Sequence, residues 1–299
     1  MNSGFSQLQD VFTVLENSNR AKILLATYLA GKTDMNSAKD IGTICGVLYG
    51  EELSAASLTS NLNRLDAIGL ILKEKEVMVG SVATNFHSMT DLGRIGLLYL
   101  FLTTMSPILI QDEEKLIKLI QNQDFRQVIN YLLKESYEIN KSIRKFITKS
   151  IQTKKEKIPL IKIEPLTLEP PRIFAGKNPL RLKIFEELIW DHLDVGAGLS
   201  LNDFLCRLNV SSRITSHLKA LLPLLEEINE GKQKYYRLSR RGLLALVPFS
   251  WLLASTIGDS RAEIGTFLAA PHVNDNPLST LVRNSLNFFS KMKEIMGEL

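Results

Sequence analysis

Residues 58–76 read LTSNLNRLDAIGLILKEKE and residues 85–101 read NFHSMTDLGRIGLLYLF. A similar pair occurs in the second half of the chain, where residues 214–232 read ITSHLKALLPLLEEINEGK and residues 233–251 read QKYYRLSRRGLLALVPFSW. Both copies have apolar residues at helical spacing, then a polar charged run, then a hydroxyl residue and a glycine before an apolar stretch. Leu58 aligns with Ile214 at an offset of 156, and Phe86 aligns with Tyr235 at an offset of 149. The difference of seven residues lies between two polar charged runs, where a loop absorbs extra residues at small entropic cost. We therefore expect one supersecondary unit to be present twice.

The first copy predicts three helices, a β-hairpin and a closing helix. Apolar residues recur at helical spacing up to Ala30, and Gly31 is expected to end that helix as its C′ residue. Ser37 is a candidate N-cap for the next helix. Beyond the third helix, β-compatible residues flank Gly80 and Ser81, which suits a hairpin. The expected elements are helices over residues 19–30, 37–45 and either 54–68 or 57–68, strands over 72–79 and 84–89, and a helix over 90–102.

The second copy predicts the same order of elements. Its first helix is expected to open at residues 178–184, NPLRLKI, which parallel residues 18–23, SNRAKI. Ser200 is a candidate N-cap for its second helix. Pro223 is expected to shorten or bend its third helix, because proline lacks a backbone N–H and clashes with the preceding turn. A short wing over residues 226–238, turning at Glu230, Gly231 and Lys232, is expected to precede a closing apolar helix.

Several of these segments resemble known DNA-binding proteins. The order helix, helix, helix, hairpin, helix is the winged helix-turn-helix pattern. Residues 54–71, SAASLTSNLNRLDAIGLI, resemble the recognition-helix region of winged-helix repressors of the arsenic-repressor and multiple-antibiotic-resistance-repressor types. Residues 90–93, TDLG, resemble the T-x-x-G that leads out of their wing, and residues 178–184 resemble the first-helix opening of the arsenic-repressor type. The resemblance implies an archaeal or bacterial DNA-binding protein.

The predicted fold is mostly α with small β-hairpin wings, in two winged helix-turn-helix domains. A helical connector joins the domains, because helical periodicity runs over residues 112–153. It is followed by IPLIKIEPLTLEPP at residues 158–171, whose prolines favour an extended, stiff linker. The expected domains are residues 1–105 for the first winged helix, 106–171 for the connector and proline-rich linker, 172–257 for the second winged helix, and 258–299 for a C-terminal loop and amphipathic helix.

Length and composition favour a globular protein of about two domains. The 299 residues are 45% apolar and 23% charged, close to ordinary globular usage, so a sizeable core is expected and wholesale disorder is not. The formal net charge of +4 permits contact with an anionic polymer but does not by itself indicate nucleic-acid binding.

Cysteine usage and the apolar runs favour a cytoplasmic protein. Cys45 and Cys206 lie far apart without nearby cysteine or histidine partners, so neither a disulfide framework nor a zinc site is expected. The first ten residues lack the charged and apolar regions of a secretory signal. The most apolar runs, residues 95–102 and 243–257, are shorter than the roughly 20 residues of a spanning helix, so no membrane partner is expected.

The sequence predicts no enzymatic chemistry. It contains no phosphate-cradling glycine loop, no H-E-x-x-H and no nucleophile elbow. The histidines, His87, His192, His217 and His272, are scattered and are interpreted as surface or packing residues rather than ligands. We therefore expect no catalytic residues, no metal and no cofactor.

The third helix of each copy is the candidate DNA-binding element. An α-helix fits the major groove, and polar or basic side chains on its outward face reach bases and phosphates. Lysines of each wing are placed to touch phosphates beside the groove. The candidate residues are Ser57, Thr59, Ser60, Asn63 and Arg64 in the first helix, Ser212, Arg213, Thr215, Ser216, His217 and Lys219 in the second, and Lys73, Lys75, Lys232 and Lys234 in the wings.

Each of these features also has a structural interpretation. Polar helix faces are solvated surfaces in most proteins, and glutamates reduce the net positive charge of both wings. The basic run over residues 141–157 either tracks a phosphate backbone or forms the solvated edge of a helix. In the resembling families, flanking helices form a homodimer interface. The helices at residues 112–153 and 277–298 therefore either join two copies or pack within one chain.

The predicted function is a sequence-specific transcriptional regulator that places recognition helices in the major groove of double-stranded DNA. One alternative is a tandem winged-helix scaffold for protein–protein assembly. Another is a plasmid-type replication initiator. Fold alone does not decide among these three.

Overall fold

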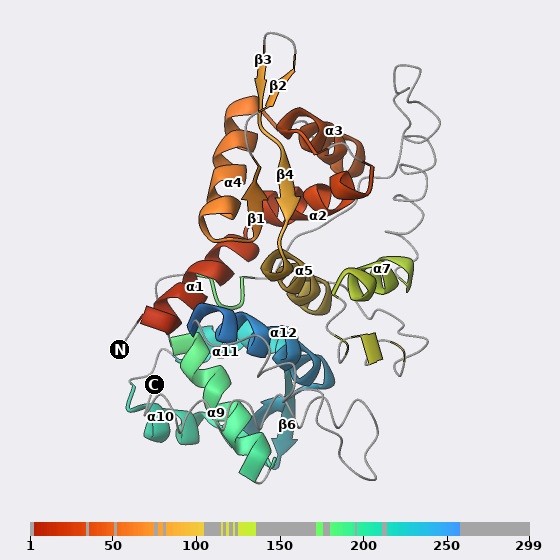
Figure 1. The fold of residues 1–299 in the computed structure, drawn as a ribbon. Coiled ribbons are helices and arrows are strands. Elements are labelled where there is room, and N and C mark those ends of the chain that lie inside the picture. Colours follow the sequence, from red (N-terminus) through yellow and green to blue (C-terminus); the bar gives the residue numbers. More distant parts are fainter. Residues whose placement is uncertain are drawn as a thin grey trace. The chain divides into compact units, whose positions relative to one another are not determined.

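The computed structural model describes residues 3–33, 36–50, 53–74, 77–79, 82–104, 115, 118–119, 122, 125–135, 172–175, 180–194, 196–210 and 214–257. Most of these residues are helical, and the strands pair in small antiparallel sheets (Figure 1). The predicted mostly α class with small β-sheets is therefore confirmed. The proline-rich linker, the basic run over residues 141–157 and the C-terminal helix lie outside the described residues.

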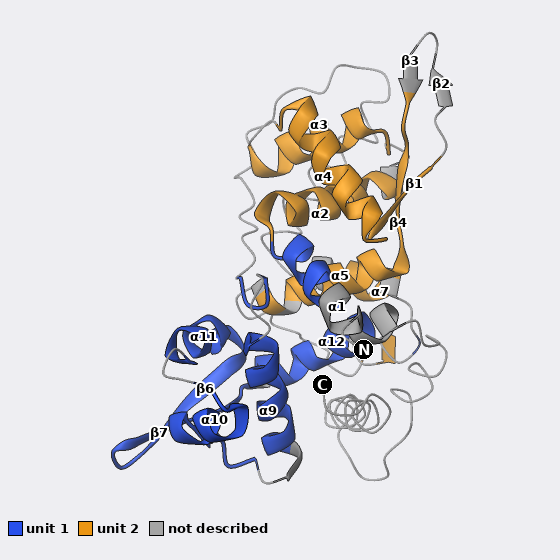
Figure 2. Ribbon diagram, turned by 90° about the vertical axis from the view of Figure 1, so that its left-hand side faces the viewer, with its two compact units in different colours: residues 1–16, 121–123, 171–299 blue, residues 17–120, 124–170 orange. Residues whose placement is uncertain are grey.

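The chain forms two compact units, coloured separately in Figure 2. Unit 1 comprises residues 1–16, 121–123 and 171–299, and unit 2 comprises residues 17–120 and 124–170. Residues 1–16, which the sequence analysis grouped with residues 17–105, thus belong to the unit that holds the second copy of the repeat.

Unit 2 contains the first copy of the repeat. Its second helix has the predicted N-cap, because the Ser37 side chain accepts from the backbone N–H of Asp40 and the Asp40 carboxylate accepts from that of Ser37. The prediction that Gly31 ends the first helix is wrong. Gly31 lacks the positive φ of a C′ glycine, and the helix continues to Thr33. The helices are α2 (Ser18–Thr33), α3 (Ala38–Tyr49), α4 (Ala55–Ala67), α5 (Asp91–Thr104) and α7 (Phe125–Glu135).

The predicted hairpin of the first copy is present as two paired segments. β1 and β4 pair antiparallel with Ile71 opposite Met89, and β2 and β3 pair with Val77 opposite Thr84. The strands are β1 (Ile71–Lys73), β2 (Val77–Val79), β3 (Val82–Thr84) and β4 (His87–Met89).

Unit 1 contains the second copy. Ser200 caps its second helix through a capping box with Asp203, as predicted. Pro223 has the predicted effect, because the third helix ends at Leu221 and a 3₁₀ turn follows. The elements are α9 (Leu180–Asp194), β5 (Leu199–Ser200), α10 (Leu201–Leu208), α11 (Ile214–Leu221), η1 (Leu222–Leu224), β6 (Leu225–Glu230), β7 (Gln233–Leu238) and α12 (Arg240–Ile257).

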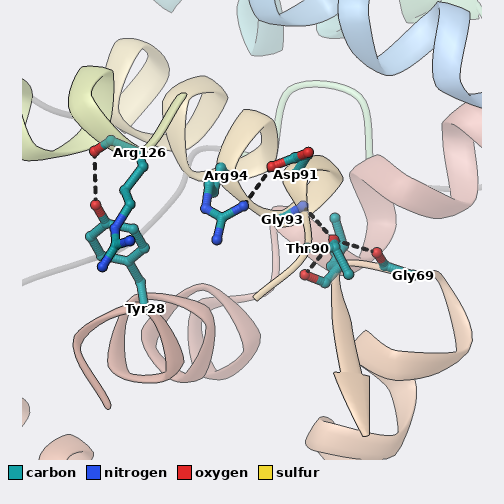
Figure 3. Close-up of polar contacts among 8 residues, drawn as sticks. Tyr28, Gly69, Thr90, Asp91, Gly93, Arg94 and Arg126 are labelled. Atoms are coloured by element: carbon teal, nitrogen blue, oxygen red, sulfur yellow. Dashed lines mark hydrogen bonds and ion pairs between the residues drawn. The ribbon is translucent and has the colours of Figure 1, made fainter. Parts of the chain in front are cut away.

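A hydroxyl residue and a glycine fix the start of the last helix in the first copy. The backbone N–H of Thr90 donates to Leu70 O, and the Thr90 hydroxyl accepts from the N–H of Gly93 at 3.0 Å (Figure 3). A Cβ on Gly93 would overlap Leu70 O. Glycine is therefore required for α5 to lie this close to the chain that leaves α4.

The second copy repeats these contacts atom for atom. The backbone N–H of Ser239 donates to Leu224 O at 3.0 Å, and the Ser239 hydroxyl accepts from the N–H of Gly242 at 3.1 Å. A Cβ on Gly242 would overlap Leu224 O. The duplication inferred from the sequence thus extends to the contacts of Gly93 with Leu70 and of Gly242 with Leu224, which we call the joint of each copy.

α1 (Ser3–Leu15) packs within unit 1 through an aromatic cluster and a buried carboxylate. The Phe12 ring lies 4.9 Å from that of Phe174 and 5.3 Å from that of Phe249, measured between centroids. Glu16 is 2% exposed and accepts from the backbone N–H groups of Phe174 at 2.9 Å and Ala175 at 2.7 Å. These contacts join residues 158 and 159 positions apart in the chain.

We predict that Gly93→Ala and Gly242→Ala each destabilise the protein by about 3 kcal/mol, because the added methyl must displace a backbone carbonyl. The matched control is Gly31→Ala, since a Cβ there meets nothing within 4 Å. It should change stability by less than about 1 kcal/mol, in the stabilising direction. Urea unfolding of the three variants measures the difference. Equal urea midpoints for Gly93→Ala and the parent would contradict the requirement for glycine at this position.

We predict that Glu16→Ala destabilises unit 1 by about 2–4 kcal/mol, because two buried N–H groups lose their acceptor. Glu16→Gln keeps one acceptor oxygen and should lose less stability than Glu16→Ala. Asp10→Ala is the control, since Asp10 is exposed on the same helix. Thermal unfolding of the full chain measures all three. If Glu16→Ala is as stable as Asp10→Ala, the hydrogen bonds of Glu16 to Phe174 and Ala175 do not stabilise unit 1.

Candidate nucleic-acid interface

α4 has a leucine face and a polar face. Its predicted core residues, Leu58, Leu62 and Leu65, are all buried. Ser54 is the N-cap, because its side chain accepts from the N–H of Ser57. Ser57 is half-buried, and the exposed candidates on the opposite face are Thr59, Ser60, Asn63 and Arg64.

Arg20, which the sequence analysis did not select, contacts this helix. Its Nε donates to Asn61 Oδ1 at 3.1 Å and so joins α2 to α4. Burial lowers the pKa of the Arg20 guanidinium, and nearby Arg64 lowers it further. Two arginines therefore lie within electrostatic reach of each other beside the polar face. The sequence contained one signal that could have identified Arg20: the similarity of SNRAKI to NPLRLKI aligns Arg20 with Arg181.

α11 presents a shorter polar face. Ile214, Leu218 and Leu221 are buried on its inner side. On the outer side Thr215, Ser216 and Lys219 are exposed. Ser212 and Arg213 lie outside the described residues.

His217 adds little positive charge to α11. It is half-buried, and its pKa is lowered first by burial and then by nearby Arg181. The imidazole is therefore neutral at pH 7. Lys219 supplies the positive charge on the described outward face of this helix, which is less cationic than the sequence suggested.

The candidate lysines of the wings differ in whether a nearby carboxylate neutralises their charge. Lys73 is exposed on β1, and Lys232 is exposed at the turn between β6 and β7. Lys234 forms an ion pair with Glu227, Nζ to Oε2 at 3.0 Å, and this contact raises the lysine pKa. Arg237 pairs with Glu226 on the same hairpin. Lys75 lies outside the described residues.

The structure brings the candidates together in two groups. In unit 2, α4 and β1 share a contact, since the backbone N–H of Lys73 donates to Asp66 Oδ1. In unit 1, α11 is joined to the β6–β7 hairpin through the 3₁₀ turn η1. Each unit thus carries one exposed helix face and one hairpin.

The described residues include no group of three or more histidine, cysteine, aspartate or glutamate side chains able to hold a metal ion. Both cysteines are free, Cys45 being buried and Cys206 exposed. No described helix is long and apolar enough to cross a membrane.

Comparisons with protein-family models, curated proteins and solved structures found no match.

Proposed function

We propose that this chain is a sequence-specific DNA-binding transcriptional regulator made of two winged helix-turn-helix domains. The support is the repeated order of elements in the two units: three helices, an antiparallel hairpin and a closing helix. In such a domain the third helix enters the major groove and the hairpin is the wing. α4 and α11 are then the recognition helices.

The observation that carries this proposal is the two-sided character of α4 and α11. Buried leucine and isoleucine fix one face of each helix in its unit, and small polar or basic side chains cover the other face. Short side chains let a helix approach base edges closely. Asn63 and Arg64 are able to make bidentate contacts with adenine and guanine respectively.

The wings serve as phosphate contacts in this proposal. Phosphate neutralisation supplies most of the affinity of DNA-binding proteins and makes that affinity salt-dependent. Lys73 and Lys232 carry exposed charges suited to this role, whereas Lys234 first has to leave Glu227. We therefore assign Lys73, Lys219 and Lys232 larger phosphate contributions than Lys234. The protein would act without a cofactor, and a homodimer would read a palindromic site.

A second candidate function is a scaffold that binds other proteins. Two observations favour it: Leu72 on β1 is 56% exposed, and ion pairs neutralise much of the β6–β7 hairpin. An exposed apolar side chain in unit 2 and a charge-neutralised hairpin in unit 1 each suit a protein partner better than a phosphate backbone. A replication initiator would share the DNA contacts proposed above and differ only in the site bound.

Titration of the full chain with a random duplex at about 50 mM salt should show binding that weakens steeply as salt rises. Arg64→Glu and Lys219→Glu should each lower the affinity about tenfold or more and flatten the salt dependence. Fluorescence anisotropy of a labelled duplex measures both quantities.

Lys183→Glu is the matched control, because Lys183 is exposed on α9, outside the proposed faces, and the change in charge is the same. It should bind as the parent does. Absence of binding at low salt would rule out the DNA proposal and leave the scaffold. An equal loss in all three variants would contradict the assignment to α4 and α11.

A further inference from the structure

Unit 2 contains a cavity that the proposed DNA-binding surface does not use. It encloses about 230 Å³ and is lined by residues of α2, β4, α5 and α7, together with the chain before α3. Its polar lining residues are Thr27, Tyr28, Asn36, His87, Ser88, Arg94 and Arg126. Segments far apart in the sequence therefore converge on one small space.

Two arginines give this cavity a positive character. Arg94 on α5 and Arg126 on α7 both extend from their helices toward α2 (Figure 3). One terminal nitrogen of Arg94 pairs with Asp91, while its Nε is buried and has no hydrogen-bond partner in the described part of the chain. No ion pair to the Arg126 guanidinium occurs among the described residues. Both arginines line the cavity, whereas Asp91, the carboxylate paired with Arg94, is not among its lining residues, so the cavity has an excess of positive charge.

His87 adds a second buried polar atom at the wall. Its side chain is 4% exposed, and Nδ1 has no hydrogen-bond partner in the described residues. Burial lowers the pKa of His87, with Lys73 acting in the same direction and Asp66 and Glu74 opposing. The imidazole is therefore neutral at pH 7. Buried polar atoms normally have a partner, so a polar ligand or an ordered water would satisfy the Arg94 and His87 nitrogens.

The wall of the cavity is held by hydrogen bonds that do not occupy the guanidinium groups. The Tyr28 hydroxyl donates to the backbone carbonyl of Arg126 at 3.0 Å and lies 2.8 Å from Asn130 Oδ1. These bonds join α2 to α7 and fix the backbone from which the Arg126 side chain extends. The Arg94 side chain is half-buried and that of Arg126 is exposed, and both guanidinium groups retain donors for a ligand.

We propose that this cavity binds a small organic carboxylate. Guanidinium groups match the planar carboxylate fork and form charge-assisted hydrogen bonds with it. The Tyr28 ring, Met89 and Gly31 also line the cavity and suit the organic part of the ligand. A single inorganic ion would fill only part of the volume, since one water molecule takes up about 30 Å³.

A bound carboxylate would bridge α5 and α7. Its oxygens would accept hydrogen bonds from both Arg94 and Arg126. Because the ligand binds the folded protein only, it should raise the unfolding temperature in proportion to its occupancy. This proposal does not depend on DNA binding, and it is tested on the protein alone.

Calorimetric titration of the full chain with acetate, succinate, benzoate and citrate tests the site, with sodium chloride at equal ionic strength as reference. At least one carboxylate should bind saturably and raise the unfolding temperature. Arg126→Gln should weaken that binding about tenfold or more, because a charged hydrogen-bond partner is lost. Gly31→Leu should weaken it by filling the cavity without removing a charge.

Lys39→Gln is the control for the loss of one positive charge in the same unit, because Lys39 is exposed on α3 and does not line the cavity, and it should bind the carboxylate as the parent does. Inorganic phosphate is the control for the organic part. The proposal is wrong if no carboxylate binds, if Arg126→Gln binds as tightly as Lys39→Gln, or if phosphate binds and the carboxylates do not. Circular dichroism of each variant verifies that a loss of binding is not a loss of fold.

Discussion

The structure depends on the close approach of a helix to a backbone carbonyl, repeated once in each unit. Gly93 lies against Leu70 O and Gly242 against Leu224 O, at positions where any side chain would overlap the carbonyl. The hydroxyl three residues earlier closes the same turn. This joint connects the closing helix of each copy, α5 or α12, to the chain that leaves the third helix. The exposed faces of α4 and α11 are thereby held on the outside of their units.

Sequence reasoning succeeded where structure is set locally. Ser37, Ser200 and Pro223 act within a turn or two of themselves, through capping and through a missing N–H, and the structure places all three as predicted. It failed at Gly31, where the helix continues although glycine is a frequent terminator. The position of α1 could not be predicted, because Glu16 finds its partners at Phe174 and Ala175, far away in the chain.

In the candidate sites, too, local features could be predicted from the sequence, whereas features set by distant residues could not. Helical periodicity identified which side chains of α4 and α11 face outward, because the leucine spacing fixes the inner face. Charge could not be predicted in this way, since the pairing of Lys234 and the burial of His217 depend on neighbouring elements. The cavity was missed for a related reason. Its lining comes from four elements and the chain before α3, and His87 was interpreted from sequence as a packing residue.

The position of α1 has a consequence for how the chain folds during synthesis. Unit 1 is discontinuous: the chain leaves it after Glu16 and, apart from residues 121–123, re-enters it at residue 171. Glu16 and Phe174 are hydrogen-bonded, so the two ends of this inserted segment meet. Synthesis produces α1 first, yet its aromatic partners emerge more than 150 residues later. The apolar face around Phe12 has to remain unpaired while unit 2 folds, and that interval is when the nascent chain is most open to aggregation.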